Sequence, residues 1–92
     1  MGLFTSKLSN TTQLLRLPQA IEMMAISRAS FYRSIKDGVI PPQVKLGPNS
    51  VAWLSHELET IISARICGYS DDEIKQLVNE LITARQSLME NI

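Results

Sequence analysis

Residues 39–50 constrain the fold of this chain more than any other segment, because they cannot be helical. The consecutive pair Pro41-Pro42 lacks two backbone N–H groups and clashes with a helical backbone. An alternating stretch at 44–46, a Gly-Pro-Asn-Ser turn and an apolar run at 51–54 follow it. This pattern predicts a β-hairpin, with helical sequence before and after it.

Two short helices are predicted before the hairpin. Pro18 suits the first turn of a helix over residues 18–24, which follows a short extended stretch. Ser27 is a good N-cap after a tight turn, so a second helix is expected over 28–37 and ends at Gly38. A helix pair joined by such a turn and followed by a hairpin is the layout of a winged helix-turn-helix.

Two further helices are predicted after the hairpin. Ser55 is predicted to cap the third, which ends at Gly68, and the capping box of Ser70 and Glu73 begins the fourth, which runs to about Met89. The apolar stripe of the third helix consists of Leu58, Ile61, Ile62 and Ile66. We therefore expect a mainly α fold with a small β-hairpin: a winged helix-turn-helix followed by a C-terminal amphipathic helix. Its expected parts are a flexible tail (1–13), a winged helix-turn-helix DNA-binding domain (14–66) and an acidic amphipathic helix (67–92).

The charges are unevenly distributed, although the formal net charge of the 92 residues is zero. Residues 1–54 carry six cations and two anions, and residues 55–92 carry three cations and seven anions. One half is therefore basic, at +4, and the other acidic, at −4. Such asymmetry favours an anionic partner for the basic half and keeps the acidic half away from it.

Composition argues against several function classes. A single cysteine, Cys67, and a single histidine, His56, exclude a disulfide within the chain and make a metal site improbable. The sequence pairs no nucleophile with a base and has no glycine-rich phosphate loop, so we expect no enzyme, no cofactor and no small-molecule substrate. No apolar run is long enough for a membrane span, so we expect no membrane partner. We interpret Cys67 as a small half-buried side chain, His56 as a surface residue and Trp53 as part of the core.

The second helix carries the candidate binding surface. On a helical wheel, Phe31 and Ile35 share the buried side, and the opposite side holds two cations, a phenol and a small residue. The guanidinium of Arg33 is suited to guanine in the major groove, and the ammonium of Lys36 is suited to phosphate. The predicted DNA-binding residues are Ser27, Arg28, Ala29, Ser30, Tyr32, Arg33 and Lys36 on this helix and Lys45, Asn49 and Ser50 in the hairpin.

An ordinary solvated helix face is the alternative interpretation of these residues. The helix and tight turn that precede them, and the hairpin that follows, favour DNA binding. No acidic residue precedes Asp37 on this helix, so its cations are not neutralised locally.

Three segments resemble the AlpA family of small phage and prophage regulators. They are 14–18 (LLRLP), 27–38 (SRASFYRSIKDG) and 41–54 (PPQVKLGPNSVAWL), and the resemblance extends over residues 14–66. It implies a winged-helix DNA-binding protein, related to excisionases and to the MerR-type DNA-binding domain. It further implies binding near integrase genes or attachment sites, where such proteins regulate transcription or bias recombination toward excision.

Two residues depart from the family's pattern. The turn commonly has glycine where this chain has Ala25, and a left-handed alanine there would cost about 1 kcal/mol. The hairpin commonly carries arginine where this chain has Asn49, which weakens the expected contact and leaves Lys45 as its only cation.

The last helix has two interpretations. Its apolar stripe either caps the small domain or pairs two copies of the chain, and we predict a homodimer with half-sites about one helical turn apart. The predicted dimerisation residues are Ile74, Leu77, Val78, Leu81, Ile82 and Leu88. The acids of this helix are expected to point away from DNA.

We therefore predict a sequence-specific DNA-binding transcriptional regulator of phage or prophage origin, which controls integrase expression or assists prophage excision. Its expected partners are double-stranded DNA, a second copy of the chain and an integrase or recombinase. Its expected location is the bacterial cytoplasm, at the nucleoid. The alternative is a protein-interaction adaptor or antirepressor that acts through the last helix without binding DNA.

Overall fold

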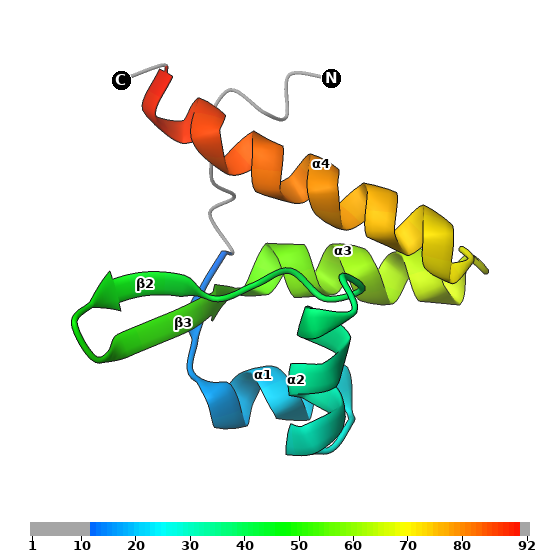
Figure 1. Ribbon diagram of the computed structural model, residues 1–92, viewed down its shortest axis with the longest axis horizontal. Coiled ribbons are helices and arrows are strands. Elements are labelled where there is room, and N and C mark those ends of the chain that lie inside the picture. The colour runs from blue at the N-terminus through cyan, green and yellow to red at the C-terminus, as the bar shows by residue number, and fades with distance from the viewer. Residues whose placement is uncertain (1–11, 91–92) are drawn as a thin grey trace.

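The computed structural model describes residues 12–90 of the chain, which are mainly helical (Figure 1). The elements in order are β1 (Leu14–Leu15), α1 (Leu17–Met24), α2 (Arg28–Lys36), β2 (Val44–Gly47), β3 (Ser50–Leu54), α3 (Ser55–Ile66) and α4 (Asp71–Glu90). This order confirms the predicted fold class, a winged-helix-like arrangement with a small sheet and a C-terminal helix. Most of the tail predicted at 1–13 lies outside the described residues.

The sheet has the predicted hairpin and one additional strand. β2 and β3 pair antiparallel, with Lys45 opposite Val51, and an irregularity follows before Gly47. The two-residue β1 adds to the other edge of β3, where Leu15 lies opposite Trp53, so the strand order is β1-β3-β2. Because alternate residues of a strand face opposite sides, Lys45 lies on the same face of the sheet as Trp53.

The turn between α1 and α2 is as tight as the sequence predicts. Ala25 ends α1 in the left-handed conformation, with φ 58° and ψ 39°, and its amide donates to the carbonyl oxygen of Ile21 at 2.9 Å. Ser27 then caps α2, because its hydroxyl accepts the backbone N–H of Ser30 at 3.1 Å. Gly38, at φ 81°, follows the end of α2.

Two clusters of buried side chains hold the elements together. The first lies between the sheet and the first three helices, where the ring of Trp53 meets that of Phe31 edge-on at 5.2 Å. Trp53 is only 1% exposed, which confirms its prediction as a core residue. The second cluster joins Ile61 and Ala64 of α3 to Ile74 and Val78 of α4. The C-terminal helix is thus part of the same packed unit.

Ser55 does not cap α3, contrary to the sequence prediction. It is the first residue of the helix, and the cap position is occupied by Leu54, which makes no side-chain cap bond. The Ser55 hydroxyl instead accepts the amide of Gln13 at 2.8 Å, while its own amide donates to the Gln13 carbonyl at 2.9 Å. The Ser55 hydroxyl therefore bonds to Gln13, which is distant in the sequence and next to β1, and not to the first backbone amides of its own helix.

Three further residues differ in burial from their sequence interpretations. Ile66 is 80% exposed and does not belong to the buried stripe, because α4 packs on the side of α3 that carries Ile61. Cys67 is exposed and not half-buried. His56 is partly buried, with its Nδ1 at 3.3 Å from the hydroxyl of Thr12.

The fourth helix begins with the predicted capping box. The amide of Ser70 donates to the Glu73 carboxylate at 2.8 Å, and the amide of Glu73 donates to the Ser70 hydroxyl at 3.2 Å. The apolar stripe then lies against α3: Ile74 and Val78 are buried, and Leu77, Leu81 and Ile82 pack partly against the same cluster. Much of the stripe predicted to pair two chains is therefore covered within one chain.

Candidate nucleic-acid interface

The start of α2 is organised by its own cap. The Ser27 hydroxyl accepts the Ser30 amide and donates to the Ser30 hydroxyl at 3.0 Å. Both serines are exposed, but the proton of Ser27 is already engaged. The Ser30 hydroxyl retains its own proton, so of the two it is the better placed donor to an external anion.

The outer face of α2, formed by Ala29, Tyr32, Arg33 and Lys36, is open to solvent. All four residues are exposed, and Tyr32 keeps 45% of its surface accessible. Beneath them, Phe31 is fully buried and fixes the rotation of the helix about its axis. The buried side predicted from the helical wheel therefore packs inward, and these four side chains point outward.

The cations of the outer face form no ion pair with any of the residues that the structure describes. Within residues 12–90 the ion pairs are those of Arg65 with Asp71 and of Arg85 with Glu57, and neither involves α2. Arg33 and Lys36 lie in the last turn of α2, where they also interact favourably with the negative end of the helix dipole. That stabilisation needs no partner and leaves both side chains free to meet an anion.

The wing, defined here as residues 44–54, carries the second group of predicted residues. Lys45 and Asn49 are exposed, and Ser50 is half-buried. Because Lys45 lies on the sheet face that packs against Phe31, it is on the side of the wing that faces α2. Lys45 and the outer face of α2 are thus both open to solvent, on two different elements of the fold.

Arg16 belongs to this surface and was missed in the sequence. Its guanidinium donates to the Ser50 hydroxyl at 2.9 Å and to the carbonyl oxygen of Val51 at 3.1 Å, and it is exposed. β1 is only two residues long, so this side chain satisfies part of the β3 edge that β1 leaves open. In the sequence, the only indication of this role was a cation directly after a short strand. The partners of Arg16 are 34 and 35 residues away and could not be seen there.

Most of the acidic helix lies apart from this surface. In Figure 1, α4 runs along one side of α3, whereas α1 and α2 lie on the other side. Most of α4 and its acids are therefore separated from the basic face, whereas the start of α4 approaches the end of α2, where Lys75 lies next to Gly38.

Residues 12–90 contain neither a cluster of metal-ligating side chains nor a helix able to span a membrane. No group of three or more His, Cys, Asp and Glu side chains suited to a metal ion occurs in residues 12–90. None of the helices described here has the length and apolar character needed to cross a lipid bilayer.

A tight helix pair, an exposed cationic second helix and an adjacent hairpin define the chain as a small winged-helix-like protein. The chain belongs to the AlpA family, because the family model described as "Prophage CP4-57 regulatory protein (AlpA)" matches residues 13–66. This confirms the resemblance seen in the sequence and places the protein in a phage-related regulatory family.

A relative from a phage supports the same assignment. The protein is 39% identical over 56 residues to "Uncharacterized protein ORF88" of Enterobacteria phage P4. The match covers 61% of this chain and 64% of that relative, which is a little under two thirds of its length. No solved structure is significantly similar to the chain.

Proposed function

We propose that this protein is a sequence-specific DNA-binding regulator, which controls transcription of an integrase gene or assists excision of a prophage. The observation that carries the proposal is the exposed cationic face of α2, whose Arg33 and Lys36 form no ion pair among residues 12–90, together with the exposed Lys45 of the wing. Membership of a prophage regulatory family supports it. The site of action would be the bacterial cytoplasm, at the nucleoid.

In the proposed complex, α2 enters the major groove with its outer face toward the bases. Arg33 grips guanine through its planar fork, and Ala29 allows close approach to a thymine methyl group. Lys36, Tyr32 and Arg28 contact phosphates, with Ser30 near the helix start. Lys45, Asn49, Ser50 and Arg16 meet the neighbouring backbone from the wing side, which extends the contact beyond one groove.

Pairing of two copies remains a prediction. Ile74 and Val78 are buried against α3, so contact between two α4 helices would use the half-buried Leu88 and the exposed Met89 instead. An integrase or recombinase partner is likewise a prediction, and its docking surface is not assigned to any residue.

The proposal is tested with duplex DNA that flanks the protein's own gene, by footprinting and by affinity measurements across salt concentrations. We expect Arg33→Ala to lose about 1–3 kcal/mol of discrimination between sites, because the base contact is lost.

Lys36→Ala should weaken binding to all sequences and lower the salt slope by about 1, because one phosphate contact disappears. A footprint over two half-sites, spaced by about 10 base pairs, indicates that two copies bind.

Arg65→Ala is the matched control. It also removes a cation, but this one is exposed on α3 and already paired with Asp71 at 2.7 Å. Its effect on DNA affinity should be small. Absence of DNA binding by the unaltered protein would contradict the proposal and favour the adaptor or antirepressor alternative. Unchanged site preference in Arg33→Ala would show that the base contact is assigned to the wrong residue.

A further inference from the structure

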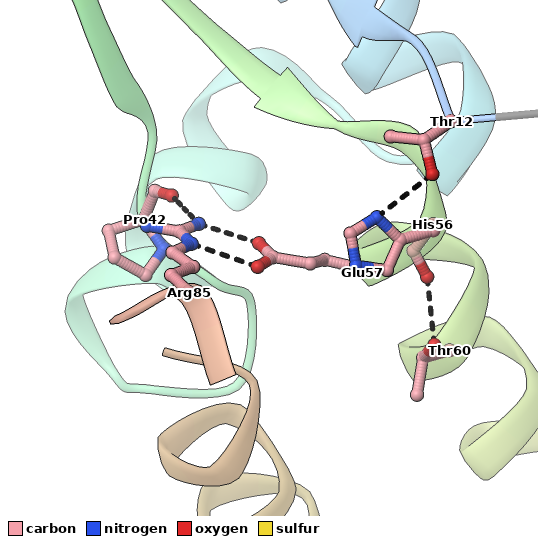
Figure 2. A network of polar contacts seen from close by, with 6 residues as sticks. All are labelled: Thr12, Pro42, His56, Glu57, Thr60 and Arg85. Atoms are coloured by element: carbon pink, nitrogen blue, oxygen red, sulfur yellow. Dashed lines mark hydrogen bonds and ion pairs between the residues drawn. The ribbon is translucent and has the colours of Figure 1, made fainter. Parts of the chain in front are cut away.

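Arg85, near the C-terminal end of α4, joins three parts of the fold (Figure 2). Its Nε donates to one carboxylate oxygen of Glu57 at 2.8 Å, and its Nη2 donates to the other at 2.6 Å. The same Nη2 also donates to the carbonyl oxygen of Pro42 at 2.7 Å. The carboxylate side chain is only 2% exposed and that of Arg85 19%, so the cluster is largely shielded from water.

The segment that receives this bond can form few backbone hydrogen bonds, and its other attachment is the packing of the buried Ile40 and Pro41. Pro41 and Pro42 have no backbone N–H to donate, so their carbonyl groups are their only backbone hydrogen-bonding groups. Pro42 lies two residues before β2, which is an edge strand of the sheet. The bond from Arg85 thus anchors the chain directly where it enters the wing.

The carboxylate of Glu57 orients the guanidinium for this bond. Glu57 lies in the first turn of α3, directly after the wing, and its two oxygens accept from two nitrogens of the planar fork. This arrangement fixes the plane of the guanidinium and directs Nη2 toward Pro42. A lysine in place of Arg85 has no such fork and cannot reproduce all three bonds in this plane.

α4 also supports the opposite face of the wing base. Leu54 of β3 lines a small cavity together with Leu81, Arg85 and Leu88 of α4. Trp53 packs on the other face, in the first core cluster. The base of the wing is therefore held between the core and α4, with the Arg85 bond at its edge.

We propose that Arg85 is a positioning residue for the wing, so that α4 contributes to DNA binding without touching DNA. This inference rests on the proposed function. Through the Pro42 carbonyl, Arg85 sets the direction in which residues 43–45 leave the core, and so where the ammonium of Lys45 meets the phosphate backbone. Arg85 lies outside the family-matching residues 13–66, yet both of its partners lie within them.

Stability alone is a weak explanation of this ion pair. Replacing a buried ion pair with apolar side chains of similar size is often neutral or stabilising, whereas removal of one partner is strongly destabilising. The informative change is therefore the double variant Glu57→Met/Arg85→Met, which preserves volume, leaves no unpaired charge and removes the donor to Pro42. Arg65→Met, at the exposed pair with Asp71, is the matched control.

The test compares the effect of Lys45→Gln on DNA binding in the two backgrounds. In the unaltered chain Lys45→Gln should lower the salt slope by about 1, as the loss of one phosphate contact does. In the double variant the same substitution should change the slope little, because the wing no longer presents the ammonium at that phosphate. The effect of Arg33→Ala should be equal in both backgrounds, which separates wing position from general loss of folding. The Arg65→Met background should behave as the unaltered chain does.

Amide hydrogen exchange tests the inference without DNA. The amides of Val44 and Ala52, which form the hydrogen-bonded pair of β2 and β3, should exchange about tenfold faster in the double variant, while those within α2 stay unchanged. If the double variant does not unfold cooperatively, Arg85→Lys is used in the same measurement, because it keeps the charge but not the three bonds.

Each failure points to a different conclusion. A full Lys45→Gln effect in the double variant, or unaltered exchange in the wing, overturns the role of Arg85 and leaves the proposed function intact. Loss of DNA binding by the unaltered chain overturns the proposed function, and the exchange measurement then still decides whether Arg85 holds the wing.

Discussion

At the scale of single residues, Ala25 adopts a backbone conformation that is unfavourable for alanine. It is the one residue other than glycine with positive φ among those described, and it sits in the turn that sets α2 against α1. Left-handed geometry brings its Cβ close to backbone oxygen, which a glycine would avoid. The sequence comparison with the AlpA family anticipated this cost, because the family commonly has glycine at that position.

Ala25→Gly is expected to stabilise the protein. The relief of left-handed strain, about 1–2 kcal/mol, exceeds the entropy that glycine adds to the unfolded chain, about 0.4–1 kcal/mol. A net gain of about 1 kcal/mol raises Tm by roughly 4–8 °C in a domain of this size. Thermal and urea unfolding measure it.

Ala29→Gly is the matched control for this prediction. It makes the same substitution at an exposed position inside α2, where glycine costs about 0.5–1 kcal/mol. The two variants should therefore shift stability in opposite directions. A loss of stability in Ala25→Gly as large as that in Ala29→Gly would contradict the left-handed conformation of the turn.

At the scale of elements, local signals predicted most of the boundaries. Pro41-Pro42 excluded a helix and so indicated the hairpin that follows. Ser27 and Gly38 marked the two ends of α2, and Ser70 with Glu73 marked the start of α4. Each of these signals acts within about four residues, so the sequence displays it directly.

The residues that sequence reasoning missed are governed by distant partners. Ser55 has the chemistry of a cap, but Gln13, 42 residues earlier, takes its hydroxyl. Arg16 and Arg85 resemble ordinary surface cations in the sequence, yet they bind backbone carbonyls 35 and 43 residues away. No local pattern records such pairs, because they form only when the fold brings the elements together.

The two serines at helix starts give a prediction at this scale. Ser55→Ala removes the acceptor of the Gln13 amide, which should cost about 0.5–1.5 kcal/mol and speed hydrogen exchange at Gln13. Exchange in the first turn of α3 should not change, because Ser55 does not cap it. Ser70→Ala removes a true cap at a cost of about 1 kcal/mol and should speed exchange at Glu73. Faster exchange at residues 57–58 in Ser55→Ala would restore the capping role predicted from the sequence.

At the scale of the whole molecule, the family region and α4 look separate in the sequence but pack together in the structure. The family match ends at residue 66, the composition turns acidic near residue 55, and the predicted domain boundary fell between 66 and 67. The packing crosses that boundary, because α3 and α4 share one core cluster and the buried ion pair. In a chain this short, the family region alone would leave Ile61 without its main cover.

Ile74→Ala tests whether the chain unfolds as one unit. Ile74 is fully buried between α3 and α4, so its truncation should cost about 2–5 kcal/mol. The fluorescence of Trp53, which reports on the core of the family region, and the helical circular dichroism should shift together in urea. Ile66→Ala, at a site 80% exposed, is the control and should change stability by less than about 0.5 kcal/mol. If the helical signal of Ile74→Ala falls at lower urea while Trp53 keeps its original midpoint, α4 is a separate unit. The wing would then have to hold its position without α4.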